Sequence, residues 1–392
     1  MLKMNTTERI IATLDGEEVD RVPTFSILYD QHPAHQILGY PKHTDADLIN
    51  SRIGQLALKR WGNKRLGRLF CQADVKKNVY LGIEAAIKLG FDSAWAPWAP
   101  NLSCFPDPNT IQDDWGNYND ISFDDYGNGT YYYREPKITS PEAYEKWPFF
   151  PDPDKIAKKA NKFYKQMHAK FGSKICLFGE VYSPIYQAIF LGVGIEKLSY
   201  YILKKPDFIK DFIKRLEEYA IKVAMAIMDA GLKVIMKGDD FSFKTGPQFS
   251  PKIFDKYWGP AYTRLCEAVH ERGGKMIMHS CGDNTKLFDN FIKWGFDGGH
   301  AYENTSNVDI YEQKKLHGDK FTIIGGMGVD YLLTFDSKPE EVVEKTKELI
   351  KNLAPGGRFI LAPTHSHPNV DMSKERIMLE TAWEYGKYPI NF

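Results

Sequence analysis

The feature that most constrains the fold is a succession of eight short apolar runs, each followed by polar residues. Runs of this length with few internal charges predict strands that are buried on both faces. They are Val22–Leu28, Gly90–Ala96, Lys174–Gly179, Lys233–Gly238, Lys275–His279, Phe296–Tyr302, Phe321–Gly326 and Arg358–Pro363. Helical patterns separate them, and the predicted helices include Asp207–Ala230, Pro251–Arg272, Lys286–Trp294, Val308–His317, Pro339–Leu353 and Lys374–Tyr385. This alternation predicts an α/β fold, a parallel (β/α)8 TIM barrel.

An open doubly wound sheet is the alternative architecture. No GxGxxG sequence stands at a strand–helix junction, so a dinucleotide site has little support. We interpret residues 1–392 as one barrel domain with two insertions. The first, at about 32–89, is helical, with helices near Asp45–Trp61 and Val75–Lys88. The second, at about 101–136, contains a β-hairpin, because the turn Asp125–Gly129 is followed by the strand Thr130–Tyr133.

The composition excludes several classes of protein. Lys and Arg total 51 and so do Asp and Glu, so the chain lacks the basic surplus of a nucleic-acid-binding protein. No apolar segment is long enough for a signal peptide or a membrane span. The 5 cysteines are few and odd in number, which does not indicate a disulfide framework. We therefore expect a cytoplasmic protein with no nucleic-acid or membrane partner, and we leave a homodimer open.

Acids, histidines and aromatic residues follow nearly every predicted strand, at the end where parallel barrels carry their chemistry. Taken singly, each is more often a cap or a loop residue than a catalyst. Asp239 and Asp240 point to opposite faces if they continue a strand, and we favour Asp240 for the barrel mouth. The alternative is that one of the two caps the following helix or pairs with a nearby Lys or Arg. Glu180 follows an apolar run, so its carboxylate needs a metal, a catalytic role or a salt bridge.

The pair His279-x-Cys281 is the sharpest pattern at these strand ends. Both side chains can face one metal if the chain turns, and Gly282 permits that turn. A thiolate and a neutral imidazole suit Zn²⁺. His365 or His367 can supply a third ligand, and the candidates for a fourth are Glu180, Asp239, His300 and Glu303. The alternative is a buried cysteine beside a histidine that bonds the backbone.

Aromatic residues gather near the same predicted rim. Those at strand ends include Tyr29, Trp95, Tyr182, Phe241 and Tyr302, and the insertion after the second strand adds Tyr131, Tyr132 and Tyr133. Much of this set must be ordinary packing. As a group, it predicts an apolar, flat-walled pocket that accepts an aromatic ligand.

These motifs resemble the uroporphyrinogen decarboxylase superfamily over nearly the whole chain. The motifs are Glu8-Arg9, Asp20-Arg21-Val22-Pro23, Gly90-Phe91-Asp92, Ser250–Phe254, His279-Ser280-Cys281-Gly282, Gly325–Asp330 and Ile360-Leu361-Ala362-Pro363. The resemblance implies a (β/α)8 barrel and one of two activities, decarboxylation or corrinoid-dependent methyl transfer. Decarboxylation is disfavoured, because Thr6–Pro23 lacks the family's Arg-rich segment and offers only Arg9 and Arg21. The HxCG motif resembles the methyltransferase branch, where it supplies two zinc ligands.

In that branch a cysteine after the last strand is usually the third zinc ligand, and here His365 stands at its place. A site with less sulfur and an aromatic mouth resembles the methyltransferases that demethylate methoxylated aromatic compounds. Those enzymes transfer the methyl group to the Co(I) of a separate corrinoid protein, which we expect to dock at the C-terminal rim. The alternatives are a corrinoid methyltransferase for a thiol, a methylamine or another small compound, a non-catalytic tetrapyrrole-binding protein, and a decarboxylase.

The resemblance and the strand ends together give a complete set of expected site residues. The expected metal ligands are His279, Cys281 and His365, and the expected metal is zinc. The expected catalytic residues are Asp240, Glu180 and Tyr182. The expected substrate-binding residues are Tyr29, Asp92, Trp95, Phe241, His300, Tyr302 and Glu303.

Overall fold

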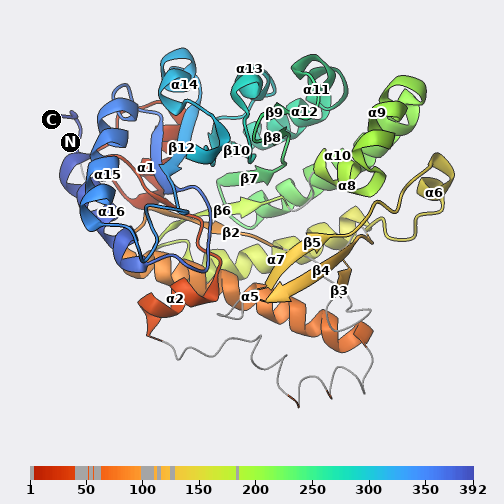
Figure 1. Ribbon diagram of the computed structural model, residues 1–392, viewed down its shortest axis with the longest axis horizontal. Helices are drawn as coiled ribbons and strands as arrows, with labels where there is room; N and C mark the ends of the chain where they lie inside the picture. Colours follow the sequence, from red (N-terminus) through yellow and green to blue (C-terminus); the bar gives the residue numbers. More distant parts are fainter. Residues whose placement is uncertain are drawn as a thin grey trace.

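The computed structural model of the protein describes residues 4–39, 52, 56, 63–98, 110–112, 116–123, 129–181 and 185–392. Its centre is a sheet of eight parallel strands (Figure 1). In spatial order they are β1 (Phe25–Ser26), β2 (Ser93–Ala96), β6 (Cys176–Glu180), β7 (Val234–Gly238), β10 (Lys275–His279), β11 (Gly298–His300), β12 (Thr322–Met327) and β13 (Phe359–Pro363). Thr24, just before β1, forms a parallel bridge with Leu361 of β13, so the sheet closes on itself. The predicted barrel and its eight strands are confirmed.

Helices surround this barrel (Figure 1). They are α1 (Thr6–Asp15), α2 (Gln31–Leu38), α5 (Asn63–Leu89), α6 (Pro141–Glu145), α7 (Pro153–Phe171), α8 (Gln187–Val193), α9 (Ile195–Lys204), α10 (Pro206–Asp229), α11 (Pro251–Tyr257), α12 (Gly259–His270), α13 (Phe288–Lys293), α14 (Ile310–His317), α15 (Pro339–Leu353) and α16 (Met372–Tyr385). In α10, Pro206 stands at the first helical position and Asp207 lies in the first turn, both favourable for a helix start. Its buried residues recur every three or four positions, so one face packs on α7 and α12.

Two apolar layers result from the alternation of side chains along each strand. Phe178, Val234, Met236 and Ile277 pack inside the barrel, whereas their strand neighbours face the helices. Side chains two residues further along a strand share the same face. Glu180 follows Phe178 by two residues and therefore points into the barrel at its carboxyl end, as His279 does after Ile277.

The insertion after β2 forms a separate three-stranded antiparallel sheet. Its strands are β3 (Thr110–Gln112), β4 (Tyr118–Phe123) and β5 (Gly129–Tyr133). The predicted hairpin is confirmed by the pairing of β4 with β5, although most of its turn lies outside the described residues. The helical insertion before β2 contains α2 and α5. The helix predicted near Asp45–Trp61 falls outside the described residues, apart from positions 52 and 56.

The helix predicted over Pro251–Arg272 is instead two helices, α11 and α12, joined at Trp258. Pro260 explains the break, because proline lacks the N–H that a continuous helix would need there. A two-stranded hairpin of β8 (Ser242–Phe243) and β9 (Gly246–Pro247) precedes α11 on the carboxyl side of β7. Within the described segments, no helix is both long enough and apolar enough to cross a membrane.

Candidate functional site

Five potential metal-binding side chains meet at the carboxyl ends of four strands. We call Asp240, His279, Cys281, Glu303 and His365 the Cys281 cluster. They form two overlapping triplets that share Cys281, one with Asp240 and His279 and one with Glu303 and His365. Within each triplet the ligand atoms all lie within 4.8 Å of one another. The structure thus brings together the three predicted metal ligands and two further acids.

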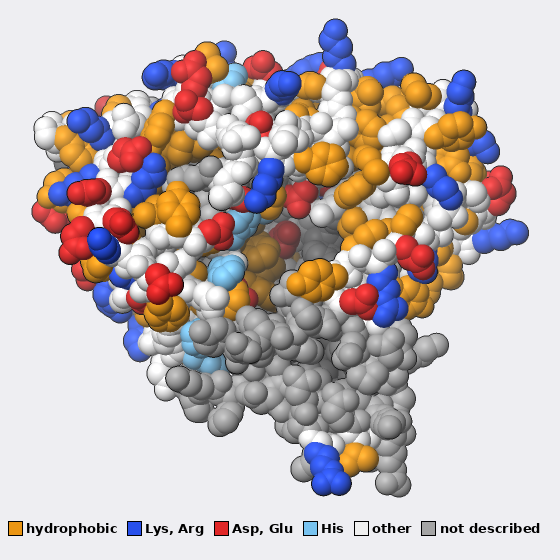
Figure 2. All heavy atoms as spheres, viewed as in Figure 1, with side chains coloured by type: hydrophobic (Ala, Val, Ile, Leu, Met, Phe, Trp, Pro, Cys, Tyr) orange, Lys and Arg blue, Asp and Glu red, His pale blue; other side chains and the backbone are white. Residues whose placement is uncertain are grey.

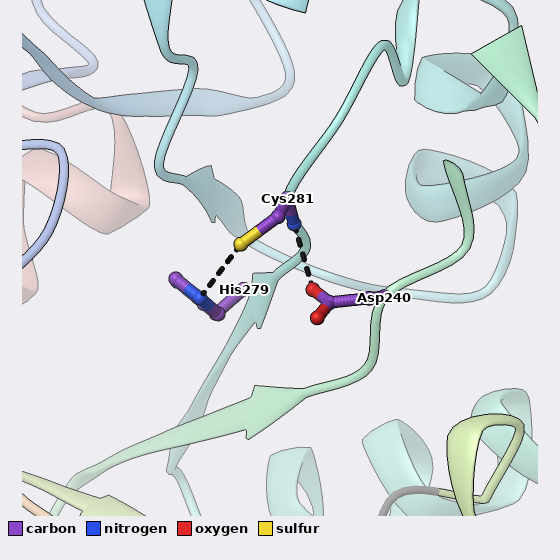
Figure 3. A group of neighbouring side chains, drawn as sticks. All are labelled: Asp240, His279 and Cys281. Carbon is purple, nitrogen blue, oxygen red and sulfur yellow. Dashed lines mark hydrogen bonds between the residues drawn. The ribbon is translucent and has the colours of Figure 1, made fainter. Parts of the chain in front are cut away.

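The first triplet is held by contacts of Cys281 on both sides. The Cys281 Sγ atom lies 3.7 Å from His279 Nε2, and the backbone N–H of Cys281 donates to Asp240 Oδ1 at 2.8 Å. Figure 3 shows the sulfur directed toward the His279 ring and the Asp240 carboxylate directed toward the Cys281 backbone. Gly282 takes φ +83°, the left-handed turn that the sequence predicted, and a Cβ there would lie 2.5 Å from the Ser242 carbonyl oxygen.

The second triplet joins loops that follow β11 and β13. His365 Nε2 lies 2.6 Å from Glu303 Oε1, and Thr305 Oγ1 donates to Glu303 Oε2 at 3.1 Å. The loop that carries His365 is tied to the loop after β1, because Ser366 Oγ accepts from the backbone N–H groups of Tyr29 and Asp30 at 3.0 and 3.1 Å. These contacts place His365 beside Glu303, although the two residues come from different strands.

Burial and neighbouring groups shift the pKa values of Cys281, His279 and Glu303. Burial raises the pKa of the Cys281 thiol well above its ordinary value, and the charges of Asp240 and Glu303 raise it further. Burial lowers the pKa of His279 to about 4, against the opposing effect of Asp240. The hydrogen bond from His365 lowers the pKa of Glu303. A half-buried thiol between two carboxylates is costly to ionise, and a bound divalent cation would offset that cost.

His300 lies behind His279, inside the barrel, and is not exposed at the barrel mouth. It is 1% exposed, and its Nδ1 lies 2.8 Å from Nδ1 of His279. Its other ring nitrogen, Nε2, lies 3.1 Å from the carbonyl oxygen of Pro363 at the end of β13. The substrate contact predicted for His300 is therefore corrected, because the ring is enclosed by His279, Pro363 and the edge-on ring of Phe25.

Asp239 and Asp240 point in different directions, as predicted for neighbours that continue a strand. Asp239 is 1% exposed and accepts hydrogen bonds from the backbone N–H groups of Ile185, Tyr186 and Gln187 at 2.7–3.1 Å. It therefore holds the chain at the start of α8, and its partners include the buried ammonium of Lys237 at 3.3 Å. This leaves Asp240 as the carboxylate of the pair that belongs to the Cys281 cluster.

Glu180 lies at the end of β6, and burial raises the pKa of its carboxyl group to about 7, partly offset by the charge of Lys237. A Cβ on Gly238 would lie 3.3 Å from Glu180 Oε1, so glycine there leaves room for the carboxyl group. A carboxylic acid with a pKa near neutrality can donate or accept a proton at physiological pH.

Tyr29 and Trp95 form an aromatic pair at the carboxyl ends of adjacent strands, with ring centroids 5.9 Å apart. The indole Nε1 of Trp95 is buried and has no hydrogen-bond partner in the described part of the chain. The face drawn in Figure 2 is hollowed near its centre, where histidine, acidic and hydrophobic side chains gather. An aromatic pair with a free indole donor can contact a flat ligand that carries an acceptor.

Two predicted aromatic contacts are corrected by the structure. Phe241 is fully buried and packs between Tyr186, Phe254 and Trp294, away from the Cys281 cluster. Tyr302 is 4% exposed and stacks on Phe288, with ring centroids 5.2 Å apart. Its backbone φ of +59° turns the chain after β11, which directs the ring into the helix layer.

One further predicted residue, Asp92, does not join the site, and another is not described. Asp92 precedes β2 and so lies at the amino end of the barrel, where it pairs with Arg9 and Arg21 at 2.6 and 2.8 Å. The prediction placed the whole run Gly90–Ala96 in the strand, whereas β2 begins at Ser93. Tyr182 falls outside the described residues.

Three polar residues that support the site were not predicted. Asn284 donates to the carbonyl oxygens of Ser280, Cys281 and Gly282 at 2.9–3.2 Å and so fixes the loop that carries Cys281. Ser366 ties the loop of His365 to the loop after β1, and Lys237 is buried beside Asp239. Asn284 follows Cys281 by three residues in a Gly-Asp-Asn run, a turn signal that could have identified it.

The barrel and its carboxyl-end cluster define an α/β-barrel protein with a mixed sulfur, nitrogen and oxygen site. The family model for uroporphyrinogen decarboxylase (URO-D) matches residues 124–385. The chain belongs to this family.

The chain is also similar to proteins that are named as methyltransferases. The chain is 24% identical over 199 residues to the methylcobamide:CoM methyltransferase MtaA of Methanosarcina barkeri, covering 51% of this chain and 55% of the relative. A second MtaA sequence, from the Fusaro strain, is 23% identical over the same shares. The chain thus spans about half the length of these curated relatives. A solved methyltransferase structure from Methanosarcina mazei matches 97% of this chain and 99% of its own with a TM-score of 0.66 and 16% identity, which supports the fold.

Proposed function

We propose that this protein is a corrinoid-dependent methyltransferase that takes the methyl group from a methoxylated aromatic compound. The acceptor is the Co(I) corrinoid of a separate protein. The Cys281 cluster is the observation that carries the proposal, because it places a thiol, two imidazoles and two carboxylates at the catalytic end of a family barrel. The named methyltransferase relatives support the same reaction class.

The donor set of the Cys281 cluster fits a zinc ion. Thiolate, imidazole and carboxylate are the ligands that Zn²⁺ takes in proteins, and four of them suffice for one ion. Cys281, His279 and His365 would hold the metal, with Asp240 or Glu303 as a further oxygen ligand. When bound, Zn²⁺ supplies Lewis acidity toward an ether oxygen or a thiol sulfur.

The chain's own residues then bind and orient the aromatic ether. Tyr29 and Trp95 form the flat wall against which the ring packs, and the unpartnered indole N–H donates to an oxygen of the substrate. Apolar walls hold the methyl group in one direction and exclude water, which lowers the entropic part of the barrier. The Asp240 carboxylate accepts a hydrogen bond from the backbone N–H of Cys281 and so holds Cys281 in place.

Glu180 is the proposed acid for the departing phenolate. Its pKa of about 7 leaves a large share of the carboxyl groups protonated at neutral pH. The protonated carboxyl group donates its proton to the phenolate oxygen as the methyl group leaves, and the carboxylate regains a proton from solvent after product release. This role is independent of the Cys281 thiol.

The carboxyl-end loops offer a surface for the corrinoid protein. Phe243, Tyr331 and Phe335 are 53%, 44% and 53% exposed and lie on the hairpin after β7 and the loop after β12. Both segments follow the carboxyl ends of strands, so these rings stand on the rim that leads to the Cys281 cluster. Exposed aromatic residues are enriched in protein–protein contacts.

The test is methyl transfer from a panel of methoxybenzoates to a reduced corrinoid protein, followed by the loss of Co(I) absorbance. We expect loss of absorbance only with the wild-type protein, the corrinoid and a methoxyarene together. No change with any methoxyarene would contradict the aryl ether as the methyl donor.

A thiol methyltransferase is the second candidate. The two curated relatives are named for methyl transfer between a methylcobamide and coenzyme M, which is a thiol. Activity with coenzyme M or methanethiol, and none with aryl ethers, would favour this candidate. The single cysteine in the Cys281 cluster and the Tyr29–Trp95 pair are the reasons why we place the aryl ether first.

A further inference from the structure

The hydrogen-bond chain from Pro363 through His300 to His279 fixes where the protons of both rings lie. The carbonyl oxygen of Pro363 can only accept, so the His300 Nε2 atom, 3.1 Å away, must carry a hydrogen. His300 Nδ1 then faces His279 Nδ1 at 2.8 Å, a distance at which one nitrogen donates and the other accepts.

Two proton arrangements with a neutral His279 satisfy this short contact. In the first, His300 is neutral and accepts from Nδ1–H of His279, which leaves the Nε2 lone pair of His279 free. In the second, His300 is a cation that donates to His279, which moves the His279 proton to Nε2. The second arrangement requires a charged ring that is 1% exposed, and no carboxylate contacts the His300 ring in the described residues. Burying an uncompensated charge is costly, so the first arrangement is favoured.

The free nitrogen of His279 points to the Cys281 cluster. His279 Nε2 lies 3.7 Å from Cys281 Sγ, on the side of the ring opposite the contact with His300. Metal-binding histidines commonly donate their other ring N–H to an acceptor, which fixes both the tautomer and the ring orientation. Here a second histidine supplies that acceptor.

We propose that His300 is a positioning residue that holds His279 in the Nδ1–H tautomer, with Nε2 free to bind the metal. The inference rests on the metal site of the proposed function, yet it concerns only the protons of two protein side chains. It also replaces the substrate contact that the sequence predicted for His300. The Pro363 carbonyl fixes the direction of these hydrogen bonds, because a backbone carbonyl can accept a hydrogen bond but cannot donate one.

The tautomer can be measured without metal and without substrate. Protein labelled with ¹⁵N-histidine is stripped of metal, and two-bond nitrogen–proton spectra are recorded at pH 7.5. The His279 signals are assigned by their loss in His279→Gln. We expect one protonated Nδ1 and one unprotonated Nε2 for wild-type His279. A wild-type His279 protonated on Nε2 would overturn the proposal, whatever the protein does in a methyl-transfer assay.

Variants of His300 test the consequence for metal binding. His300→Phe keeps an aromatic ring but removes both nitrogens, and we expect its zinc dissociation constant to rise about 10- to 100-fold, with a mixture of His279 tautomers in the metal-free protein. His300→Asn retains an amide oxygen that can accept from His279 Nδ1–H, so we expect affinity within about five-fold of wild type by the same reasoning. Zinc affinity is measured by competition with a chromophoric chelator.

Phe25→Leu is the matched control, because the Phe25 ring packs at 87° to the His300 ring and cannot form hydrogen bonds with its nitrogens. We expect this variant to lose stability but to keep the tautomer and the zinc affinity of wild type. Wild-type zinc affinity in a folded His300→Phe protein, or no better affinity in His300→Asn than in His300→Phe, would contradict a positioning role. If His300→Phe does not fold, the wild-type spectrum and the Asn variant still decide the question.

Discussion

The two ends of the barrel both gather charged groups, but only one end pairs acids with permanent cations. At the amino end, Asp92 is enclosed by Arg9 and Arg21, and Thr24 donates to it from both its backbone and its side chain. At the carboxyl end, the Cys281 cluster combines a thiol and two carboxylates with the imidazoles of His279 and His365, and burial lowers the pKa of His279. A balanced network stabilises the fold, whereas an unbalanced one is suited to bind a cation or a substrate.

The largest expected effect is on the amino end. Asp92→Ala removes the shared partner of the buried Arg9 and the partly buried Arg21, and we expect a loss of about 3–5 kcal/mol in the free energy of unfolding. Denaturant unfolding measures it, and the zinc affinity of the folded fraction should not change. A loss of zinc binding without a loss of stability would reverse the contrast between the two ends.

The matching change at the carboxyl end is Cys281→Ala. It removes the residue that both triplets share, so we expect zinc affinity to fall by more than about 100-fold and methyl transfer to fall with it. The unfolding free energy should change little. Cys266→Ala is the control, since Cys266 is a buried cysteine of α12 outside the cluster. Equal effects of the two substitutions on zinc would remove the special role of Cys281.

The sequence predicted the architecture well, because strand burial leaves a strong local signal. Each of the eight strands overlaps one of the predicted apolar runs. The side chains of the HxC motif and His365 meet at the carboxyl ends of the strands, as predicted. The misplaced residues fall into two groups. Asp92 and β2 show that a strand's true start decides at which end of the barrel a residue lies.

Residues beyond a strand end were harder to place. Asp240 and Phe241 are neighbours, yet one joins the Cys281 cluster and the other enters the aromatic core. Tyr302 is turned away by a left-handed backbone, and His300 is covered by His279. Such directions depend on contacts with distant strands, which no local pattern contains.

A third prediction concerns the acid proposed at the mouth. Glu180→Gln keeps the shape of the side chain but cannot release a proton, and we expect kcat for the aryl ether to fall about 100-fold. Because burial raises the pKa of Glu180 to about 7, its protonated form is lost as the pH rises through that value. The wild-type kcat should therefore decline above about pH 7, and the decline should be absent in Glu180→Gln. A wild-type profile that rises with pH through this range would oppose the acid role.

The smallest expected effect is on substrate contact. Trp95→Phe keeps an aromatic wall but removes the unpartnered indole N–H. The loss of one hydrogen bond of about 1 kcal/mol should lower kcat/KM for the methoxyarene about five-fold. Zinc affinity should stay as in wild type. An unchanged kcat/KM would remove the indole from the list of substrate contacts while leaving the Cys281 cluster intact.

The most direct test of the contrast between the two ends is zinc K-edge X-ray absorption on zinc-loaded wild-type protein, with metal content measured on the same sample. The Cys281 cluster predicts one zinc ion per chain, with a single sulfur ligand among nitrogen and oxygen ligands. A protein that binds no stoichiometric zinc, or zinc without sulfur in its ligand shell, would contradict the carboxyl-end metal site.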